Sequence, residues 1–268
     1  MAVTAIGWRA HAALVASGGR AEIVAPLSTS FYAHAAGELI WVGPPGTPLH
    51  PRAVLVGGGA IPTGNTVHLV IDGSAPWRPD AVAIVSPRIH DAARLLHDQL
   101  QAVGEPRGLG RLLTPADSDD AVIARARPHA RALEAACMAD DPTVMIVEGR
   151  PLLGLGGGLT PSGDDYLGGL LFGWRLIGRR RELHAWDAAA AQLAADAAAL
   201  THPISARLFA DLAAGEGWAP LHDLVKALAA GESERALQAA RHLTTVGQTS
   251  GWDVLAGLLG SLGAATSR

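Results

Sequence analysis

The hydrophobic and polar positions of this chain change their period along the sequence. In the first third, short runs rich in Val, Ile and Leu are separated by Gly- and Pro-rich segments such as 43–46 and 57–59. Several of these runs alternate in polarity, which is typical of strands with one face in water. The pattern predicts strands over residues 21–24, 39–42, 53–56, 67–71 and 81–85.

From Ser86 onwards the period becomes helical. Ser86-Pro87 is a favourable helix start, and apolar residues at 89, 93, 96 and 100 follow at helical spacing. We predict further helices over residues 120–138 (interrupted near Pro128), 186–200, 204–214, 221–230, 232–245 and from 250 onwards. Residues 143–147, Thr-Val-Met-Ile-Val, are predicted as a buried strand by their composition.

These elements predict an α+β fold in two regions. We expect a β-rich N-terminal region over residues 1–85 and a mostly α-helical region over residues 86–268. The second region contains two internally similar helix starts, which share the pattern Ser-Gly-x-Asp-x-Leu-x-Gly-Leu-Leu and begin at Ser162 and Ser250. A Ser three residues before an acidic residue and ahead of an apolar run indicates a helix N-terminus.

The repeated segments suggest one shared site. Helix N-termini present unpaired N–H groups and the positive end of the helix dipole, so two matched starts could form two halves of an anion site. Both segments also contain several glycines, each of which costs a helix about 1 kcal/mol relative to Ala. Such a cost is tolerated where backbones pack closely, so we predict that the two helices cross near their glycines. The crossing would bring Ser162 and Ser250 together.

The loop before Ser162 concentrates glycine, hydroxyl and carboxylate groups. Its glycines would allow a ligand close to the backbone, although a flexible connection that packs small residues explains them as well. His202, beside Pro203, is either a ligand contact or a plain loop residue. The candidate substrate-binding residues are Gly156, Gly157, Gly158, Thr160, Ser162, Gly163, Thr249, Ser250, Asp253 and His202.

Among the carboxylates, Asp164 is the stronger catalytic candidate and Asp165 the second. Asp165 and Asp253 occupy equivalent positions and can either cap their own helices or take part in catalysis. Asp164 has no capping role, and the second copy carries Trp252 in its place. A general base, an acceptor for a substrate amide and a Mg²⁺ ligand are the roles open to Asp164. Mg²⁺ is the one cofactor left open, because an acidic pair beside an anion needs a cation or a bound proton.

Composition narrows the class of protein. The formal net charge is −4 and there is no basic stretch, which argues against a nucleic-acid binder. No apolar stretch is long enough to span a membrane, and the single cysteine, Cys137, fits a reducing cytoplasm. A Walker A loop and a Schiff-base mechanism each require a lysine. Lys226 is the only lysine of the chain and lies far from every Gly-rich segment, so either one would have to use Lys226. We expect a cytoplasmic protein that acts on a small molecule.

Three segments together carry a resemblance to a known family. They are the string Gly-Leu-Thr-Pro-Ser-Gly-Asp-Asp-Tyr-Leu at 158–167, the pair Thr201 and Ser205, and residues 246–253. The chain resembles a bacterial family long labelled as a domain of unknown function, one member of which is a subunit of the oxamate carbamoyltransferase of anaerobic allantoin breakdown. The resemblance implies carbamoyl transfer between carbamoyl phosphate and oxamate by an assembly with other subunits. Gln248 stands where the family pattern leads us to expect His.

Three functions are therefore compared. The first is a carbamoyltransferase subunit that binds a carboxylate- or phosphate-bearing substrate. The second is a non-catalytic subunit that binds a metabolite or supports the active site of a partner. The third is a serine-dependent amidohydrolase using Ser162 or Ser250, although the sequence places no His to activate either one.

Overall fold

The computed structural model describes residues 1–57, 62, 64–71, 73, 75–80, 88–115, 119–177 and 183–263. Within it the chain divides into two compact units, Met1–Asp80 and Ala81–Arg268. A sheet in the first unit and helices in the second confirm the predicted α+β class. The predicted strand at 81–85, the helix start Ser86-Pro87 and the boundary between regions 1–85 and 86–268 lie outside the described residues.

In the described residues, the first unit is a curled six-stranded sheet with one helix. Its elements are β1 (Val3–Ile6), α1 (Trp8–Ala16), β2 (Arg20–Pro26), β3 (Phe31–Ala35), β4 (Glu38–Gly43), β5 (Ala53–Val56) and β6 (Thr66–His68). The strand order is β1-β5-β4-β3-β2-β6, and the pairs are antiparallel except for β4 with β5. Just beyond β6, Val70 pairs with Ala2 beside β1, so the two edges of the sheet meet.

The alternation of hydrophobic and polar residues predicted part of this sheet correctly. The strands predicted at 21–24, 39–42 and 53–56 are confirmed in β2, β4 and β5. The strand predicted at 67–71 is shorter, because β6 ends at His68 and Val70 contributes a single bridge. Strands β1 and β3 and helix α1 were not predicted. Helix α1 buries only Ala10, Ala13 and Leu14 against the sheet, a stripe too narrow to stand out from the sequence.

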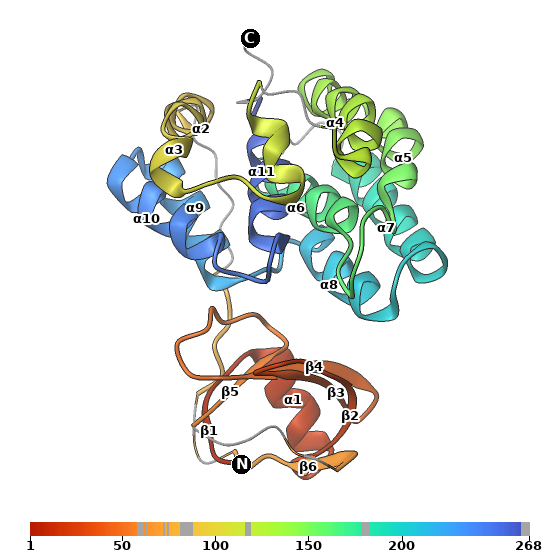
Figure 1. The fold of residues 1–268 in the computed structure, drawn as a ribbon, viewed down its shortest axis with the longest axis vertical. Helices are drawn as coiled ribbons and strands as arrows, with labels where there is room; N and C mark the ends of the chain where they lie inside the picture. Colours follow the sequence, from red (N-terminus) through yellow and green to blue (C-terminus); the bar gives the residue numbers. More distant parts are fainter. Residues whose placement is uncertain are drawn as a thin grey trace. The chain divides into compact units, whose positions relative to one another are not determined.

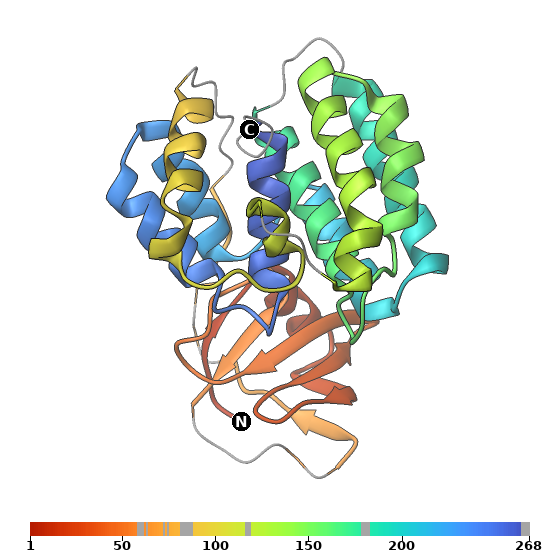
Figure 2. The ribbon, with the colours of Figure 1, turned by 45° about the horizontal axis from the view of Figure 1, so that its top comes forward.

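The second unit is helical. Its elements are α2 (Ile89–Asp98), α3 (Leu100–Val103), η1 (Gly108–Leu113), α4 (Ala121–Ala139), α5 (Pro142–Gly149), η2 (Arg150–Leu152), α6 (Ser162–Ile177), α7 (Leu183–Leu200), α8 (Pro203–Ala213), α9 (Ala219–Ala230), α10 (Ser233–Leu243) and α11 (Ser250–Ser261). Helices α6 and α11 lie side by side in the middle of the unit, with α2, α3, α9 and α10 on one side and α4, α5, α7 and α8 on the other (Figures 1 and 2). Every side chain of α11 is buried, so this helix forms the centre of the core.

The helical period was a reliable guide except at one segment. The helices predicted from 120, 186, 204, 221, 232 and 250 are confirmed, and Pro128 lies inside α4 without ending it. The buried strand predicted at 143–147 is wrong, because these residues form helix α5. Asp141 accepts hydrogen bonds from the backbone N–H groups of Thr143 and Val144, and Pro142 occupies the first turn. This N-cap and proline pair outweighs the β-branched composition of the segment.

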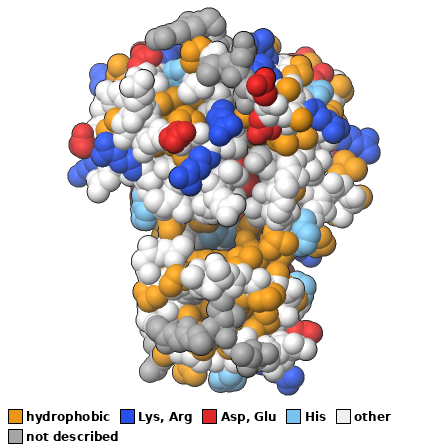
Figure 3. Space-filling model, viewed as in Figure 1, with side chains coloured by type: hydrophobic (Ala, Val, Ile, Leu, Met, Phe, Trp, Pro, Cys, Tyr) orange, Lys and Arg blue, Asp and Glu red, His pale blue; other side chains and the backbone are white. Residues whose placement is uncertain are grey.

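Charged side chains of both signs are interspersed on the face of the helical unit drawn in Figure 3. On that face they do not gather into one basic surface of the type that attracts nucleic acid. Among the described residues, no helix combines the length and the apolar character needed to cross a membrane.

Candidate functional site at the crossing of two helix starts

Helices α6 and α11 cross with their backbones in direct contact. A Cβ atom on Gly169 would lie 2.3 Å from the carbonyl oxygen of Val254, and one on Gly257 would lie 1.9 Å from that of Tyr166. Only glycine fits at such separations, so the crossing predicted from the glycines is confirmed. The propensity cost of these residues is offset by the packing that they permit.

The glycine of each Ser-Gly pair is required by a neighbouring carbonyl group. A Cβ atom on Gly163 would lie 2.1 Å from the carbonyl oxygen of Leu152, and one on Gly251 would lie 2.0 Å from that of Leu243. The two backbone N–H groups also have protein acceptors: Gly163 donates to Leu155 and Gly251 donates to Val246. The N–H group of this glycine in each copy therefore fixes the chain that precedes its helix rather than a ligand.

Hydroxyl groups from the two copies meet in pairs across the crossing. The Oγ1 atom of Thr160 lies 3.2 Å from the Oγ atom of Ser250, and the Oγ atom of Ser162 lies 3.4 Å from the Oγ1 atom of Thr249. All of these side chains are at least partly buried. The structure thus brings together predicted site residues that are far apart in the sequence.

The equivalent carboxylates bind across the same crossing. Asp165, on α6, accepts a hydrogen bond from Ser250 at the start of α11. Asp253, on α11, accepts hydrogen bonds from the hydroxyls of Ser162 and Thr249. Each aspartate of the repeat is therefore held by the serine of the other copy. The structure replaces the predicted capping of their own helices by these bonds.

Backbone donors from η1 complete the surroundings of Asp253. The N–H group of Leu109 donates to Asp253 Oδ1 at 2.6 Å, and the N–H group of Gly110 donates to the same carboxylate. At Gly108, which has a φ of +52°, a Cβ atom would lie 2.4 Å from Asp253 Oδ1. Sequence reasoning missed these residues. The Gly-Leu-Gly run at 108–110 is the signal that could have indicated a close backbone approach.

Both equivalent carboxylates are almost fully buried. Asp165 is 2% exposed and Asp253 is 0% exposed. Burial raises the pKa of Asp253 to about 7, with hydrogen bonds from Thr249 and Ser162 acting in the opposite direction. Burial also raises the pKa of Asp165 well above its usual range, and the charge of Asp253 adds to this effect. A protonated carboxyl group near neutral pH reduces the negative charge that a bound anion would meet.

Asp164 has a different environment. Its Oδ1 atom accepts a hydrogen bond from the N–H group of Gly154 at 2.8 Å, and its Oδ2 atom accepts one from Ser205 at 2.6 Å and another from Thr201. These bonds do not cap α6, but they tie it to the glycine loop and to the start of α8, a structural role that the sequence did not indicate. Burial raises the pKa of its carboxyl group, and these hydrogen bonds act against the rise.

The glycine-rich loop is open on one side. Gly156 and Gly158 have φ values of 120° and 87°, in the region that favours glycine. Gly157 and Gly158 are exposed, and a Cβ atom on either one would meet nothing within 4 Å. A Cβ atom on Gly156 would lie 2.9 Å from the backbone nitrogen of Ser162. The loop therefore reaches the first turn of α6 with its backbone accessible.

His202 lies at the edge of this arrangement. It is exposed at the N-terminus of α8, where its Nδ1 atom accepts a hydrogen bond from the N–H group of Ile204 at 3.2 Å. His202 is therefore the N-cap residue of α8, and a contact between its side chain and a ligand stays a prediction. Within the described residues, no group of three or more His, Cys, Asp or Glu side chains is arranged to hold a metal ion.

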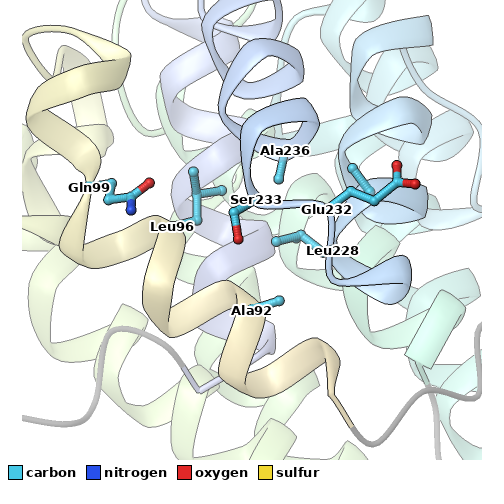
Figure 4. A pocket seen from close by; sticks show the side chains of 8 residues that line it. Ala92, Leu96, Gln99, Leu228, Glu232, Ser233 and Ala236 are labelled. Atoms are coloured by element: carbon cyan, nitrogen blue, oxygen red, sulfur yellow. The ribbon is translucent and has the colours of Figure 1, made fainter.

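Two hollows elsewhere in the helical unit suit a substrate less well. A small one of about 10 Å³ lies between α2, α9 and α10, next to Ala92, Leu228 and Ala236 (Figure 4), and has room for about one water molecule. A wider groove between α9 and α10 carries Lys226 and Arg235 together with acidic side chains. Arg235 is paired there with Glu232 at 2.8 Å. Because charges of both signs line this groove, it favours a small anion less than the two helix starts do.

These features define a class: a helical unit whose core contains a hydroxyl–carboxylate site built by two copies of one helix start. The model of a family described as oxamate carbamoyltransferase subunit AllH matches residues 152–262, and this match confirms the family resemblance drawn from the sequence. The matched range contains both Ser-Gly-x-Asp segments. A family named for a subunit implies further subunits of a complex. Searches among curated proteins and among solved structures found no match.

Proposed function

We propose that this chain is a subunit of a carbamoyltransferase and that the crossing of α6 and α11 binds its carboxylate- or phosphate-bearing substrate. One observation carries the proposal: the hydroxyl and carboxylate groups of both motif copies meet at one crossing, in two hydrogen-bonded clusters that each join the two copies inside the matched range. A network built only for stability would not need two partly buried hydroxyl pairs beside an accessible glycine loop.

Carbamoyl transfer to oxamate sets defined chemical requirements. The amide nitrogen of oxamate forms a bond to the carbonyl carbon of carbamoyl phosphate, the bond from that carbon to the phosphate oxygen breaks, and phosphate leaves. The amide nitrogen loses one proton to a base. Negative charge that develops on the carbonyl oxygen needs hydrogen-bond donors.

The residues at the crossing match these requirements. The exposed backbone of Gly157 and Gly158 would allow a phosphate or a carboxylate to approach the N–H groups of the loop. Thr160 and Thr249 supply hydroxyl groups at the rim of the network. Asp165 and Asp253 supply carboxyl groups whose raised pKa values suit proton transfer near neutral pH. A catalytic role for Asp164 remains a prediction, and its three protein donors favour a structural role.

A non-catalytic subunit is the second candidate. The observation that favours it is the internal bonding of the site, since the N–H groups of Gly163 and Gly251 donate to protein carbonyl groups and Asp164 has three protein donors. The amidohydrolase reading loses support. The side-chain partners described for the Ser162 and Ser250 hydroxyls are Thr and Asp residues rather than a histidine that could activate them.

One experiment tests the proposal. The chain is purified alone and together with the subunits encoded beside it, and phosphate release from carbamoyl phosphate is followed with and without oxamate. We expect the double substitution Ser162→Ala with Ser250→Ala to lower kcat/KM of the assembly by roughly 100-fold or more, because it removes the centre of the hydroxyl network. Thr245→Ala, an exposed hydroxyl near α10, is the matched control.

The result separates the candidates. Full activity in a folded Ser162/Ser250 double variant would remove the site from the reaction. If the assembly loses activity but the chain alone still binds oxamate or carbamoyl phosphate in calorimetry, the chain binds substrate and requires a partner for turnover. If the chain alone binds neither ligand, and the assembly with the double variant is as active as the wild-type assembly, the non-catalytic alternative holds.

A further inference from the structure

Two buried carboxylate oxygens at the crossing lack hydrogen-bond partners. They are the Oδ2 atoms of Asp165 and Asp253, and in the part of the chain that the structure describes neither has a donor within reach. The two residues hold equivalent positions of the repeat, and the negative charge of Asp253 acts on Asp165. An unpaired buried carboxylate oxygen is costly, so a pair of them at one place requires an explanation.

The other oxygens of these carboxyl groups already have donors. Leu109, Gly110, Ser162 and Thr249 donate to Asp253, and Ser250 donates to Asp165. Each of these donors has a single proton to give. The remaining oxygens therefore cannot draw on the hydroxyls and N–H groups that surround them.

The charges around the pair make two carboxylate anions unfavourable. The side chains whose charges act on Asp165 are Asp253 and Asp164, and both are acidic. On the side of α4, Glu134 bonds to the hydroxyl of Tyr166, the residue after Asp165, and is acidic too. At the start of α8, the hydroxyls of Thr201 and Ser205 bond to Asp164, the residue before Asp165. Two like charges buried together without a cation favour the binding of a proton.

We propose that Asp165 and Asp253 share one proton between their Oδ2 atoms and act as a positioning pair that orients the hydroxyls of Ser162 and Ser250. One proton satisfies both oxygens at once, since the protonated carboxyl group donates and the other accepts. The pair carries one negative charge in place of two. The repeat then has a physical purpose: it supplies two equivalent halves of one acid pair.

The shared proton fixes the direction of the hydroxyl bonds. Ser162 donates its proton to Asp253 and Ser250 donates its proton to Asp165, so each serine oxygen offers only lone pairs to other groups. A ligand group that faces these oxygens must donate hydrogen bonds, as the N–H groups of a primary amide do. A carboxylate of the same shape has no proton to give and is rejected. The preference for an amide over a carboxylate rests on the proposed function, whereas the shared proton does not.

Infrared spectroscopy tests the proton without any ligand. A buried protonated carboxyl group has a C=O stretching band that ionised carboxylates lack. We expect such a band in the wild-type protein at neutral pH, and we expect both Asp165→Asn and Asp253→Asn to change its frequency or lower its intensity because either substitution dissolves the pair. Asp120→Asn, which changes an exposed helix cap, is the control that keeps the band. A wild-type protein without the band, or a band that both substitutions leave unchanged, overturns the proposal.

A second measurement covers variants that do not fold. In wild-type protein labelled with ¹³C at the aspartate carboxyl carbons, a proton-sharing pair gives two linked and well-separated titration steps, both above the ordinary aspartate pKa. Two independent steps near the ordinary aspartate pKa would overturn the proposal as clearly as a missing infrared band.

Calorimetry with two ligands tests the orientation of the hydroxyls. Oxamate and oxalate share a skeleton and differ by an amide in place of a carboxylate. We expect the wild-type protein in its complete assembly to bind oxamate at least roughly tenfold more tightly than oxalate, and Asp253→Asn to reduce this ratio. Equal affinities overturn the orientation step. If neither ligand binds, the proposed function fails, while the infrared band still decides the shared proton.

Discussion

The two helix starts of the second unit share Ser, Gly and Asp but differ between Gly and Asp, where α6 has Asp164 and α11 has Trp252. The shared residues do the same thing in both copies: each glycine admits a carbonyl group, and each serine bonds to the aspartate of the other copy. The differing residues point to different neighbours. Asp164 binds the glycine loop and α8, whereas Trp252 packs against Gly110 in η1.

This difference separates two tasks within one motif. The symmetric positions build a common polar network at the crossing, and the asymmetric position attaches each helix to its own side of the unit. From the sequence alone, the asymmetric residue Asp164 is the strongest catalytic candidate, because a carboxylate without a capping role suggests chemistry. The contacts favour the opposite assignment. Both carboxylate oxygens of Asp164 accept hydrogen bonds from neighbouring protein groups, whereas the Oδ2 atoms of Asp165 and Asp253 have no hydrogen-bond partner in the described structure.

The largest expected effect comes from the contact that holds both copies together. Gly257→Ala places a Cβ atom 1.9 Å from the carbonyl oxygen of Tyr166, and the two backbones must separate to accept it. We expect the free energy of unfolding to fall by about 3 kcal/mol or more, because backbone atoms cannot move aside as a flexible side chain does. Urea unfolding followed by circular dichroism measures the loss.

The control for this substitution lies in the loop. A Cβ atom at Gly157 has open space around it, and its backbone does not need a positive φ. Gly157→Ala should therefore change stability by less than about 0.5 kcal/mol. Equal losses in the two variants would mean that the crossing is less tight than the structure indicates.

The second effect tests the asymmetric position. Asp164→Ala leaves the donors of Gly154, Thr201 and Ser205 without their acceptor, so we expect a loss of about 2–4 kcal/mol in the free energy of unfolding. A structural role predicts that activity falls in proportion to the loss of folded protein. A catalytic role predicts instead an inactive variant with an unchanged thermal midpoint, and that outcome would restore Asp164 as the catalyst.

Sequence patterns predicted the crossing itself but not the way in which it is completed. The repeat of Ser, Gly and Asp, together with glycines in helices, was enough to bring α6 and α11 together. The bonds of Asp253 to η1 could not be inferred, because the Leu109 N–H donor lies 144 positions away and carries no side-chain signal. The same holds for Thr201 and Ser205 at Asp164, since their role depends on how α8 packs against α6.

The errors in secondary structure have a related cause. Residues 143–147 are β-branched and apolar, and only their neighbours Asp141 and Pro142 make them helical. Strands β1 and β3 are short segments whose pairing depends on partners elsewhere in the chain. Local composition was sufficient where a long helical period existed, as in α4 and α7, and insufficient where a cap or a partner strand decides the structure.

The third effect concerns pH and the symmetric carboxylates. Burial raises the pKa of Asp253 from an ordinary value of 3.8 to about 7, so the folded protein keeps a proton that the unfolded chain releases. The free energy of unfolding should therefore fall as the pH rises from about 4 to about 7, by up to roughly 1.4 kcal/mol per pH unit, and then level off. Asp253→Asn should flatten this slope in urea unfolding measured between pH 5 and pH 8.

Two comparisons sharpen the pH experiment. Asp120→Asn, at an exposed helix cap, should keep the wild-type slope. Asp165→Asn should flatten the slope as Asp253→Asn does, because it removes a second carboxyl group whose pKa burial raises well above its usual range. A slope that persists in both symmetric variants would show that another group, such as Glu134 with its raised pKa, controls the dependence.

The smallest effect is the most direct test of the symmetry. Ser162→Ala and Ser250→Ala each remove one hydroxyl donor from an aspartate of the other copy, so each should cost about 1 kcal/mol in the free energy of unfolding. Because the two serines serve one acid pair, the double variant should differ from the sum of the single ones by roughly 0.5 kcal/mol or more. Denaturant unfolding of all four proteins at one pH measures this coupling. Strict additivity would mean that the two halves of the repeat are neighbours in space but independent in energy, and the single network would then be wrong.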